Sequence, residues 1–290
     1  MTYLQEINGN LYAKFDRSLS LLCWAYNEEA LIGDFLERVT KLMAASIEDY
    51  EIVLIDDGST DRTYGIAESF RRNNDKLKIF RNGKNLNVGY SVRRAIASAS
   101  KDYLFWQTVD RSYDIANLRI FLEYLKEWDM VQGVRRRPVE VKVRWLKPLV
   151  ALVNMFGVKH ITRRSDTIPK AIISVINYIL IRLLFRVPLS DFQNITFYPT
   201  KWVQSIQYEA KSAFINPEGV IKSYWAGMNI KEVPIAFIPR KEGMAKGTGI
   251  KAIAAAVQDI FLLWFQWVIL GKRGRIQKGK ICRAGAIESV

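Results

Sequence analysis

The stretch EIVLIDDGSTDRT, residues Glu51–Thr63, decides how this chain folds. Its apolar part, Ile52–Ile55, has the length and the β-branched content of a buried strand. Two adjacent carboxylates, Asp56 and Asp57, follow at once, and then a glycine. The polar residues 59–61 that come next can cap a following helix. The stretch therefore predicts a strand, a turn and a helix, with acidic groups at the carboxyl end of the strand.

Short apolar runs alternate with helical patterns along the first half of the chain. Strands are predicted at Leu19–Ala25, Glu51–Ile55, Leu77–Phe80, Tyr103–Gln107 and Met130–Gly133. Helices are predicted at Glu29–Ala44, Asp61–Arg72, Gly89–Ser98 and Ile115–Trp128. This alternation is typical of an α/β fold, in which a mostly parallel sheet carries helices on both faces.

Polar side chains and a glycine follow several of the predicted strands. Because the carboxyl ends of parallel strands meet at one edge of the sheet, these residues are expected close together, where open α/β sheets bind ligands. Acid groups there suit the base and ribose hydroxyls of a nucleotide, and a glycine at a helix start permits close backbone approach. The alternative for each loop is an ordinary polar turn. The residues expected at this edge are Ala25, Tyr26, Asn27, Glu28, Asp56, Asp57, Gly89 and Asp110.

Composition narrows the class of protein. The chain is globular in composition, with 49% hydrophobic and 25% charged residues, and its net charge of +14 favours a polyanionic partner: nucleic acid, anionic lipid or a phosphorylated substrate. Cys23 and Cys282 offer neither a disulfide framework nor metal-ligand spacing. The single histidine, His160, argues against histidine-rich metal sites and against a Ser-His-Asp triad. The first eleven residues lack the pattern of a signal peptide, so a cytoplasmic setting is expected.

The motifs together resemble the family 2 glycosyltransferases of the GT-A fold, close to the dolichol-phosphate or polyprenyl-phosphate mannose synthase branch. The resemblance covers roughly residues 19 to 250. It rests on residues 25–29 (AYNEE), 56–61 (DDGSTD), 87–89 (NVG), 108–114 (TVDRSYD), 133–135 (GVR), 232–235 (EVPI) and 240–246 (RKEGMAK).

The resemblance implies roles for individual residues. Tyr26, Glu28 and Asp57 would hold the nucleoside of an activated sugar. Asp110 would bind a divalent cation, Mg²⁺ or Mn²⁺, that bridges the diphosphate and stabilises the leaving group. Basic residues suited to phosphate oxygens are Arg135, Arg240 and Lys246.

The chain departs from the family pattern at the metal motif. Thr108 stands where the family usually has the first acid of Asp-x-Asp, and Ser112 stands where a Gln often sits. With one carboxylate fewer, either metal affinity is lower or basic side chains take over part of the charge neutralisation.

Two apolar helical stretches mark the second half. Residues 170–186 place Lys170, Ser174, Tyr178, Arg182 and Arg186 at steps of four, a polar stripe suited to lipid headgroups. Residues 252–270 are long enough to span a bilayer, but basic clusters flank both ends, which favours a helix lying in the interface. Helices packed into a soluble core are the alternative. The predicted organisation is a GT-A domain over 1–250, with an interfacial helix at 165–187, and a membrane-associating helix and basic tail over 251–290.

The expected function is inverting transfer of a sugar from a nucleotide-diphosphate sugar to a polyprenyl phosphate, at the cytoplasmic face of an anionic membrane, by a peripheral or monotopic enzyme. A phosphate acceptor is already ionised near neutrality and needs no general base. A transferase acting on a glycan hydroxyl in surface polysaccharide is the first alternative, and a non-catalytic basic binding protein is the remote one. No nucleic acid is expected, because a platform of stacked aromatic and basic residues is not apparent.

Asp191 separates the first two hypotheses. It follows Pro188, Leu189 and Ser190 at the position of an Asp that the family carries before a Gly-Phe-Arg-like segment. Asp191 is expected to orient the acceptor or the sugar, to act as a general base toward a hydroxyl, or only to cap a strand. The residues expected to take part in the reaction are thus Asp110, Asp191, Arg135 and Arg240.

Overall fold

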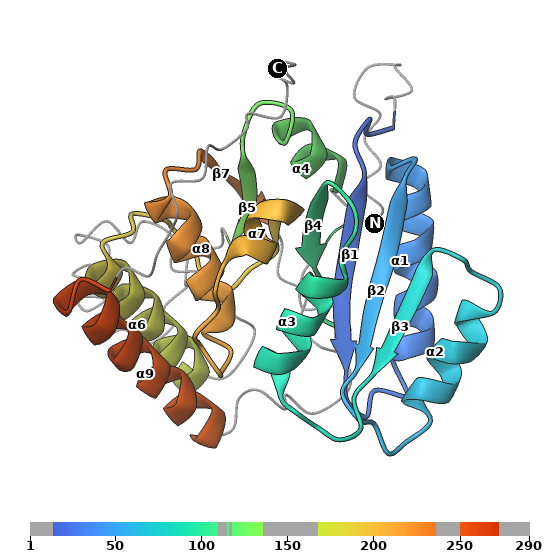
Figure 1. Ribbon diagram of the computed structural model, residues 1–290, viewed down its shortest axis with the longest axis horizontal. Coiled ribbons are helices and arrows are strands. Elements are labelled where there is room, and N and C mark those ends of the chain that lie inside the picture. Colours follow the sequence, from blue (N-terminus) through green and yellow to red (C-terminus); the bar gives the residue numbers. More distant parts are fainter. Residues whose placement is uncertain (1–13, 110–114, 116–117, 136–167, 236–249, 273–290) are drawn as a thin grey trace.

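The computed structural model describes residues 14–109, 115, 118–135, 168–235 and 250–272 (Figure 1). Its strands are β1 Leu19–Ala25, β2 Tyr50–Asp56, β3 Leu77–Arg81, β4 Tyr103–Trp106, β5 Met130–Arg135, β6 Thr196–Pro199 and β7 Ile230–Ile235. Its α-helices are α1 Ile32–Ser46, α2 Thr63–Arg71, α3 Val88–Ser98, α4 Leu118–Tyr124, α6 Ile168–Phe185, α7 Thr200–Ser205, α8 Ile215–Trp225 and α9 Ile250–Trp264. A π-helix, η3 Phe265–Ile269, continues α9.

The strands of the described part of the chain form one sheet in the order β3-β2-β1-β4-β6-β5-β7. β1 to β4 are parallel to one another, β6 runs antiparallel to both of its neighbours, and β5 and β7 pair in parallel. The predicted mostly parallel α/β sheet is therefore confirmed. Because β6 is reversed, the start of β6 lies at the same edge as the carboxyl ends of β4 and β5.

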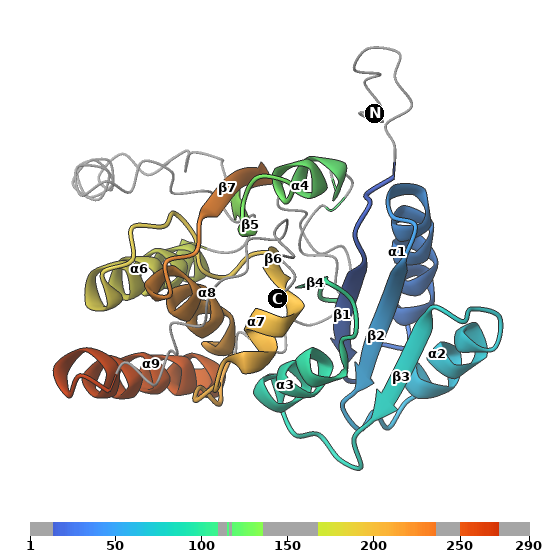
Figure 2. The same cartoon turned by 45° about the horizontal axis from the view of Figure 1, so that its top comes forward.

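Alternation of side chains along the strands builds a core on each face of the sheet. In β1, Leu21 and Cys23 pack with α1, α2 and α4, whereas Leu22 packs on the opposite face with α3, α6, α8 and α9. Figure 2 shows the two groups of helices on either side of the sheet. All seven residues of β2 are buried, which explains why its central part, Ile52–Ile55, is a continuous apolar run.

Several predicted boundaries differ from the structure. The first helix begins three residues later than predicted, at Ile32, because residues 28–31 form turns whose backbone bonds return to Glu28. The predicted helix 115–128 is helical only over 118–124. The strand predicted to reach Gln107 ends at Trp106. The interfacial helix predicted over 165–187 is α6, from residue 168 to 185, and residues 165–167 lie outside the described residues.

Some polar residues of the two C-terminal apolar helices bind other parts of the protein, and the expectation that the polar stripe of α6 faces lipid headgroups stays a prediction. Arg182 donates to the Tyr178 hydroxyl at 2.6 Å and to the Leu189 carbonyl at 3.4 Å. On α9, Asp259 accepts bonds from the backbone and hydroxyl of Ser212. The side chains of Lys170 and Ser174 lie outside the described part.

Apolar side chains occupy the outer face of the same helices. Along α9 and η3, Val257, Phe261, Phe265 and Ile269 recur at steps of four and are 40–54% exposed; we call these four residues the apolar stripe. Ile176 and Leu183 of α6 are also exposed, and α6 and α9 lie side by side in both views (Figures 1 and 2). Within the described residues, a helix both long and apolar enough to cross a membrane is not found.

Candidate functional site

The turn after β2 has a backbone geometry that only glycine adopts without strain. Gly58 has φ +75°, and a Cβ at this position would lie 2.5 to 2.9 Å from backbone atoms of Lys84 and Asn85. The loop after β3 therefore packs directly on this turn. Its position fixes where the two preceding carboxylates point.

Asp56 is tied to the protein on both oxygens. Arg81, the last residue of β3, donates from Nε to Asp56 Oδ2 at 3.0 Å, and the Ser59 backbone N–H donates to Oδ1 at 3.3 Å. The Arg81 guanidinium also donates to the Ser59 carbonyl at 3.1 Å and lies over the Tyr64 ring. Asp56, placed by sequence among the donor-binding residues, thus holds the turn in shape.

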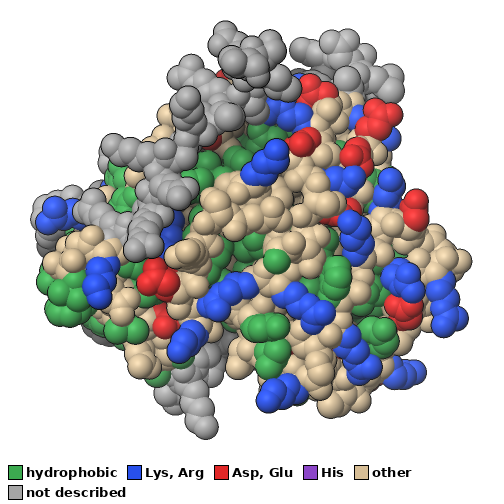
Figure 3. All heavy atoms as spheres, in the orientation of Figure 1, with side chains coloured by type: hydrophobic (Ala, Val, Ile, Leu, Met, Phe, Trp, Pro, Cys, Tyr) green, Lys and Arg blue, Asp and Glu red, His purple; other side chains and the backbone are tan. Residues whose placement is uncertain are grey.

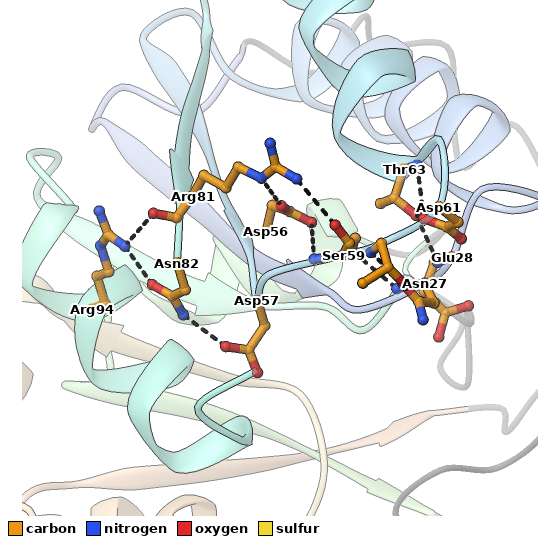
Figure 4. A network of polar contacts seen from close by, with 11 residues as sticks. Asn27, Glu28, Asp56, Asp57, Ser59, Asp61, Thr63, Arg81, Asn82 and Arg94 are labelled. Carbon is orange, nitrogen blue, oxygen red and sulfur yellow. Dashed lines mark hydrogen bonds and ion pairs between the residues drawn. The ribbon is translucent and has the colours of Figure 1, made fainter. Parts of the chain in front are cut away.

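Asp57 points away from Asp56, toward the loop that follows β3 (Figure 4). Its Oδ1 accepts from Asn82 Nδ2 at 2.7 Å and from the Leu86 backbone N–H at 3.0 Å. Arg94 of α3 donates to Asn82 Oδ1 and to the Arg81 carbonyl, which orients the Asn82 amide. Both bonds to Asp57 from the described residues end on Oδ1.

Asn27 and Glu28 join the same network from the end of β1. Asn27 has φ +51°, a left-handed conformation that Asn tolerates better than most residues. Its Oδ1 accepts from the Thr60 backbone N–H at 2.9 Å, and its own N–H donates to Ser59 Oγ at 3.0 Å. The Glu28 backbone N–H donates to Thr63 Oγ1 at 2.8 Å, which leads directly into α2.

The predicted cap of α2 takes a slightly different form. Asp61 precedes the N-cap position, which Arg62 occupies without a side-chain bond. Asp61 Oδ1 nevertheless accepts from the Thr63 backbone N–H at 2.9 Å. Asp61 therefore satisfies a donor of the first turn, as predicted, from one residue further out.

Gly89 permits a close backbone approach, and a loop of this chain occupies that space. A Cβ on Gly89 would lie 2.7 Å from the Lys211 carbonyl oxygen. Arg93 of α3 also donates to the Ala210 carbonyl in the same loop. The sequence predicted the close approach but not its partner, which comes from more than a hundred residues away in the chain.

Asp191 lies across the sheet from these residues and is 7% exposed. Its Oδ1 accepts from the backbone N–H groups of Phe192 and Gln193 at 2.8 and 3.2 Å, and its Oδ2 accepts from the Asn194 amide. Burial raises the pKa of the nearby Tyr178 phenol, against the lowering effect of Arg182, and the negative charges of Glu232 and Asp191 add to the rise.

Several predicted site residues lie outside the described residues: Asp110, Ser112, Arg240 and Lys246, together with the side chain of Arg135. Thr108 is described and half-buried just beyond β4. Ala25 lies at the predicted edge, where its carbonyl accepts from the Asp57 backbone N–H at 2.8 Å, and Tyr26 beside it is half-buried. In the described part of the chain, a group of three or more acidic, Cys or His side chains able to hold a metal is not found.

Three charged or amide side chains of the network, which were not among the predicted site residues, come from β3, its following loop and α3: Arg81, Asn82 and Arg94. Arg81 and Asn82 follow the apolar part of β3, so the rule that selected Asp56 and Asp57 also applies to them. Basic side chains also surround this region. Lys and Arg side chains gather over the region of α3 on the face shown in Figure 3, and α3 itself carries Arg93 and Arg94.

Comparison with known proteins places this geometry in a family. Glycosyltransferase AglD of Haloferax volcanii is 22% identical over 94% of this chain, which spans only 40% of that protein. Dodecaprenyl-phosphate galacturonate synthase of Rhizobium johnstonii is 26% identical over 50% of this chain and 41% of its own length.

Among solved structures, glucosyl-3-phosphoglycerate synthase from Mycobacterium tuberculosis, in complex with Mn²⁺, UDP and glucosyl-3-phosphoglycerate, has the same fold. Its TM-score is 0.53 at 15% identity, over 86% of this chain and 80% of that one. The model of the family described as "Glycosyl transferase family 2" matches residues 20–185, more than half of the chain. The chain therefore belongs to glycosyl transferase family 2.

Proposed function

We propose that this chain transfers a sugar from a nucleotide-diphosphate sugar to a polyprenyl phosphate at a membrane surface, at the cytoplasmic face, as a peripheral or monotopic enzyme. The observation that carries the choice of acceptor is the apolar stripe. A glycosyltransferase with four large apolar side chains exposed in one row is suited to an acceptor that resides in lipid.

The polar network at the carboxyl edge of β1, β2 and β3 supports the donor half of the proposal. Asp57 is 5% exposed and lies at this edge, where its Oδ2 would accept a hydrogen bond from a base or ribose group. Tyr26 and Glu28 lie at the end of the neighbouring strand. The basic side chains around α3 favour a diphosphate nearby (Figure 3).

Two features support a phosphate acceptor. The dodecaprenyl-phosphate galacturonate synthase similar to this chain carries a polyprenyl phosphate in its name. Both oxygens of Asp191 accept hydrogen bonds, three of them from within residues 192–194, so this carboxylate is badly placed to take a proton from a hydroxyl. A phosphate monoester with a second pKa of about 6 needs no such base.

In the proposed reaction, an oxygen of the acceptor phosphate attacks the anomeric carbon, and the bond to the nucleoside diphosphate breaks on the opposite face. Positioning and charge stabilisation suffice for this step. A divalent cation would stabilise the charge on the leaving diphosphate. A hydroxyl from Thr108 and one carboxylate from Asp110 fit Mg²⁺ or Mn²⁺, because such ions are commonly held by one or two carboxylates together with substrate phosphates.

The test is a transfer assay with labelled UDP-sugars and GDP-sugars and vesicles that contain undecaprenyl phosphate. Vesicles with undecaprenol instead of its phosphate are the control, and each arm is run with Mg²⁺, with Mn²⁺ and with a chelator. We expect label to enter the lipid fraction only when the lipid phosphate is present. Label that enters water-soluble glycan without stimulation by the lipid phosphate would instead establish a hydroxyl acceptor.

A further inference from the structure

A row of polar side chains crosses three neighbouring strands on the far half of the sheet. Gln132 of β5 pairs with Thr196 of β6 on one side and with Glu232 of β7 on the other. Side chains of directly paired residues stand on the same face of a sheet. Gln132 and Thr196 are 0% and 1% exposed, so these two side chains lie inside the protein, and Glu232 is half-buried.

Asp191 holds two amide side chains beside this row. The Gln132 amide donates from Nε2 to the Asp191 carbonyl oxygen at 2.6 Å, and the Asn194 amide donates to Asp191 Oδ2. Turning either amide around would place its oxygen against an oxygen of Asp191. The contacts therefore settle which end of each amide is the NH₂ group.

Within the described part of the chain, the opposite ends of these two amides are acceptors without a hydrogen-bond partner. Gln132 Oε1 and Asn194 Oδ1 are both buried and both unsatisfied, on residues that are 0% and 3% exposed. A buried amide oxygen without a partner is destabilising and rare in folded proteins. Asp191 fixes the orientation of both amides. Two such oxygens indicate a site that accepts hydrogen bonds from a ligand.

The two oxygens lie within reach of a ligand that is bound at the carboxyl edge of β1 to β3. The loop that carries Asp191 and Asn194 leads into the start of β6, which lies at the carboxyl edge of β4 and β5, and Gln132 pairs with Thr196, the first residue of β6. From β1 the sheet order passes through β4 and β6 to β5. Three steps of about 4.8 Å place β5 about 14 Å from β1, a distance that an extended nucleotide sugar can bridge.

We propose that Gln132 and Asn194 form a sugar-binding site, in which Gln132 Oε1 and Asn194 Oδ1 accept hydrogen bonds from hydroxyl groups of the transferred sugar. The inference rests on the proposed function and names the part of the site that selects the sugar. Sugar hydroxyls can donate to these oxygens, whereas a fully ionised phosphate cannot. The carboxylates of Asp191 and Glu232 nearby also disfavour a phosphate at this place.

Asp191 is then a positioning residue, since its bonds orient the two amides that meet the sugar. This role differs from that of a general base in a measurable way. A base would contribute its own ionisation to the pH dependence of transfer, whereas a positioning residue changes the choice among sugars.

The experiment measures binding by calorimetry, with the nucleotide sugar that binds best in a panel of UDP-sugars and GDP-sugars. Analogues in which one hydroxyl is replaced by fluorine keep an acceptor but lose the donor. For wild-type protein we expect one or two of these analogues to bind about 2- to 13-fold more weakly, the factor that corresponds to one neutral hydrogen bond. This arm needs no variant, so it decides the matter even if a substitution prevents folding.

Two variants locate the contact. In Gln132→Met and Asn194→Leu we expect affinity for the nucleotide sugar to fall by a similar factor, affinity for the nucleoside diphosphate to stay unchanged, and one analogue to lose its penalty. Gln204→Met is the matched control, because Gln204 also donates its amide to carbonyl groups but lies on the protein surface.

Three results contradict the inference. Unchanged sugar affinity in both folded variants overturns it, and so does an equal loss for nucleotide and nucleotide sugar. Fluorinated analogues that all bind wild-type protein like the parent sugar also overturn it. In all three cases a nucleoside diphosphate still binds, so the proposed function stands. Failure of the wild-type protein to bind any nucleoside diphosphate contradicts the proposed function as well.

Discussion

The two halves of the sheet differ in whether their buried polar groups have hydrogen-bond partners within the described residues. At the edge of β1 to β3, Asp56, Asp57 and Asn27 are held by bonds from neighbouring strands and helices. On the far half, Gln132 and Asn194 leave buried oxygens unsatisfied, and α9 with η3 exposes an apolar stripe. The first half is held by internal hydrogen bonds, whereas we propose that these groups of the second half gain partners from a ligand or a membrane.

This difference has a physical basis. A nucleoside diphosphate is small and needs hydrogen-bond partners at fixed places. A site already held by internal hydrogen bonds binds it without the entropy cost of ordering side chains. A lipid acceptor arrives from a surface of variable composition, and contact with that surface requires side chains that are exposed beforehand. The predictions below test each half separately.

The largest effect is expected at the turn of the first half. Gly58→Ala should lower the free energy of unfolding by about 2–5 kcal/mol, because the new Cβ meets backbone atoms of Lys84 and Asn85 and φ is positive. Urea denaturation measures this. Gly65→Ala is the control, because a Cβ there meets nothing within 4 Å and the residue lies inside α2. If the two variants were equally stable, the turn would not be fixed by packing.

Removal of the cation beside Asp56 is expected to cost somewhat less. Arg81→Gln leaves a carboxylate that is 1% exposed without its charged partner, which should lower the free energy of unfolding by about 2–4 kcal/mol. Arg62→Gln is the matched control, since its partner Glu29 is 40% exposed and such surface pairs contribute about 0–1 kcal/mol. Thermal unfolding of both variants provides the measurement. A larger loss of stability in Arg81→Gln means that Asp56 has a structural role, whereas equal stability of the two variants would contradict that role.

The second half is tested at its surface. Phe261→Asp should weaken binding to vesicles of anionic lipid by about 10- to 30-fold, because it removes apolar contact and adds a like charge. Ile120→Asp is the control, since both residues are 46% exposed and Ile120 lies on α4, on the other face of the sheet. Vesicle sedimentation reads out both. Equal loss in the two variants would mean that any surface charge matters, and the stripe would have no special role.

The smallest change in the free energy of unfolding is expected at Glu51, near the amino-terminal end of β2, at the edge of the sheet opposite to the candidate site. Burial favours the protonated form of Glu51, yet bonds from Lys78, Ser20 and Ser100 hold its pKa below the ordinary value. Its ionised form therefore stabilises the fold above a pH of about 4.3, and this contribution is lost as the pH falls through the lowered pKa.

Glu51→Gln should accordingly lower the free energy of unfolding by about 1–2 kcal/mol at neutral pH and by progressively less in acid. Denaturant unfolding at several pH values provides the measurement, and nucleotide binding should stay intact. A constant difference from pH 3 to pH 7 would refute the role of the charge. Glu68→Gln, an exposed partner of Arg71, is the control and should show little change.

Sequence patterns were most informative where side chains follow strands. The run Ile52–Ile55 and the acids after it predicted both the strand and its place at the ligand edge, because the period and the turn chemistry are local properties. Two contacts were not predictable, because each joins segments separated by long stretches of chain. They are the close approach of the Lys211 carbonyl to Gly89 and the hydrogen bond from Gln132 to the Asp191 carbonyl. The polar stripe predicted on α6 stays a prediction, because a single sequence cannot tell which face of a helix packs inward.

Calorimetric titration of a nucleoside diphosphate into the Asp57→Asn and Phe261→Asp proteins, with vesicle binding measured on the same preparations, tests the division between the two halves most directly. We predict that Asp57→Asn lowers nucleotide affinity by about 10-fold or more, as expected for a hydrogen bond to a charged group, and keeps vesicle binding. Phe261→Asp should keep nucleotide affinity and lose vesicle binding. If either folded variant loses both kinds of binding together, the two halves do not act separately and the account is wrong.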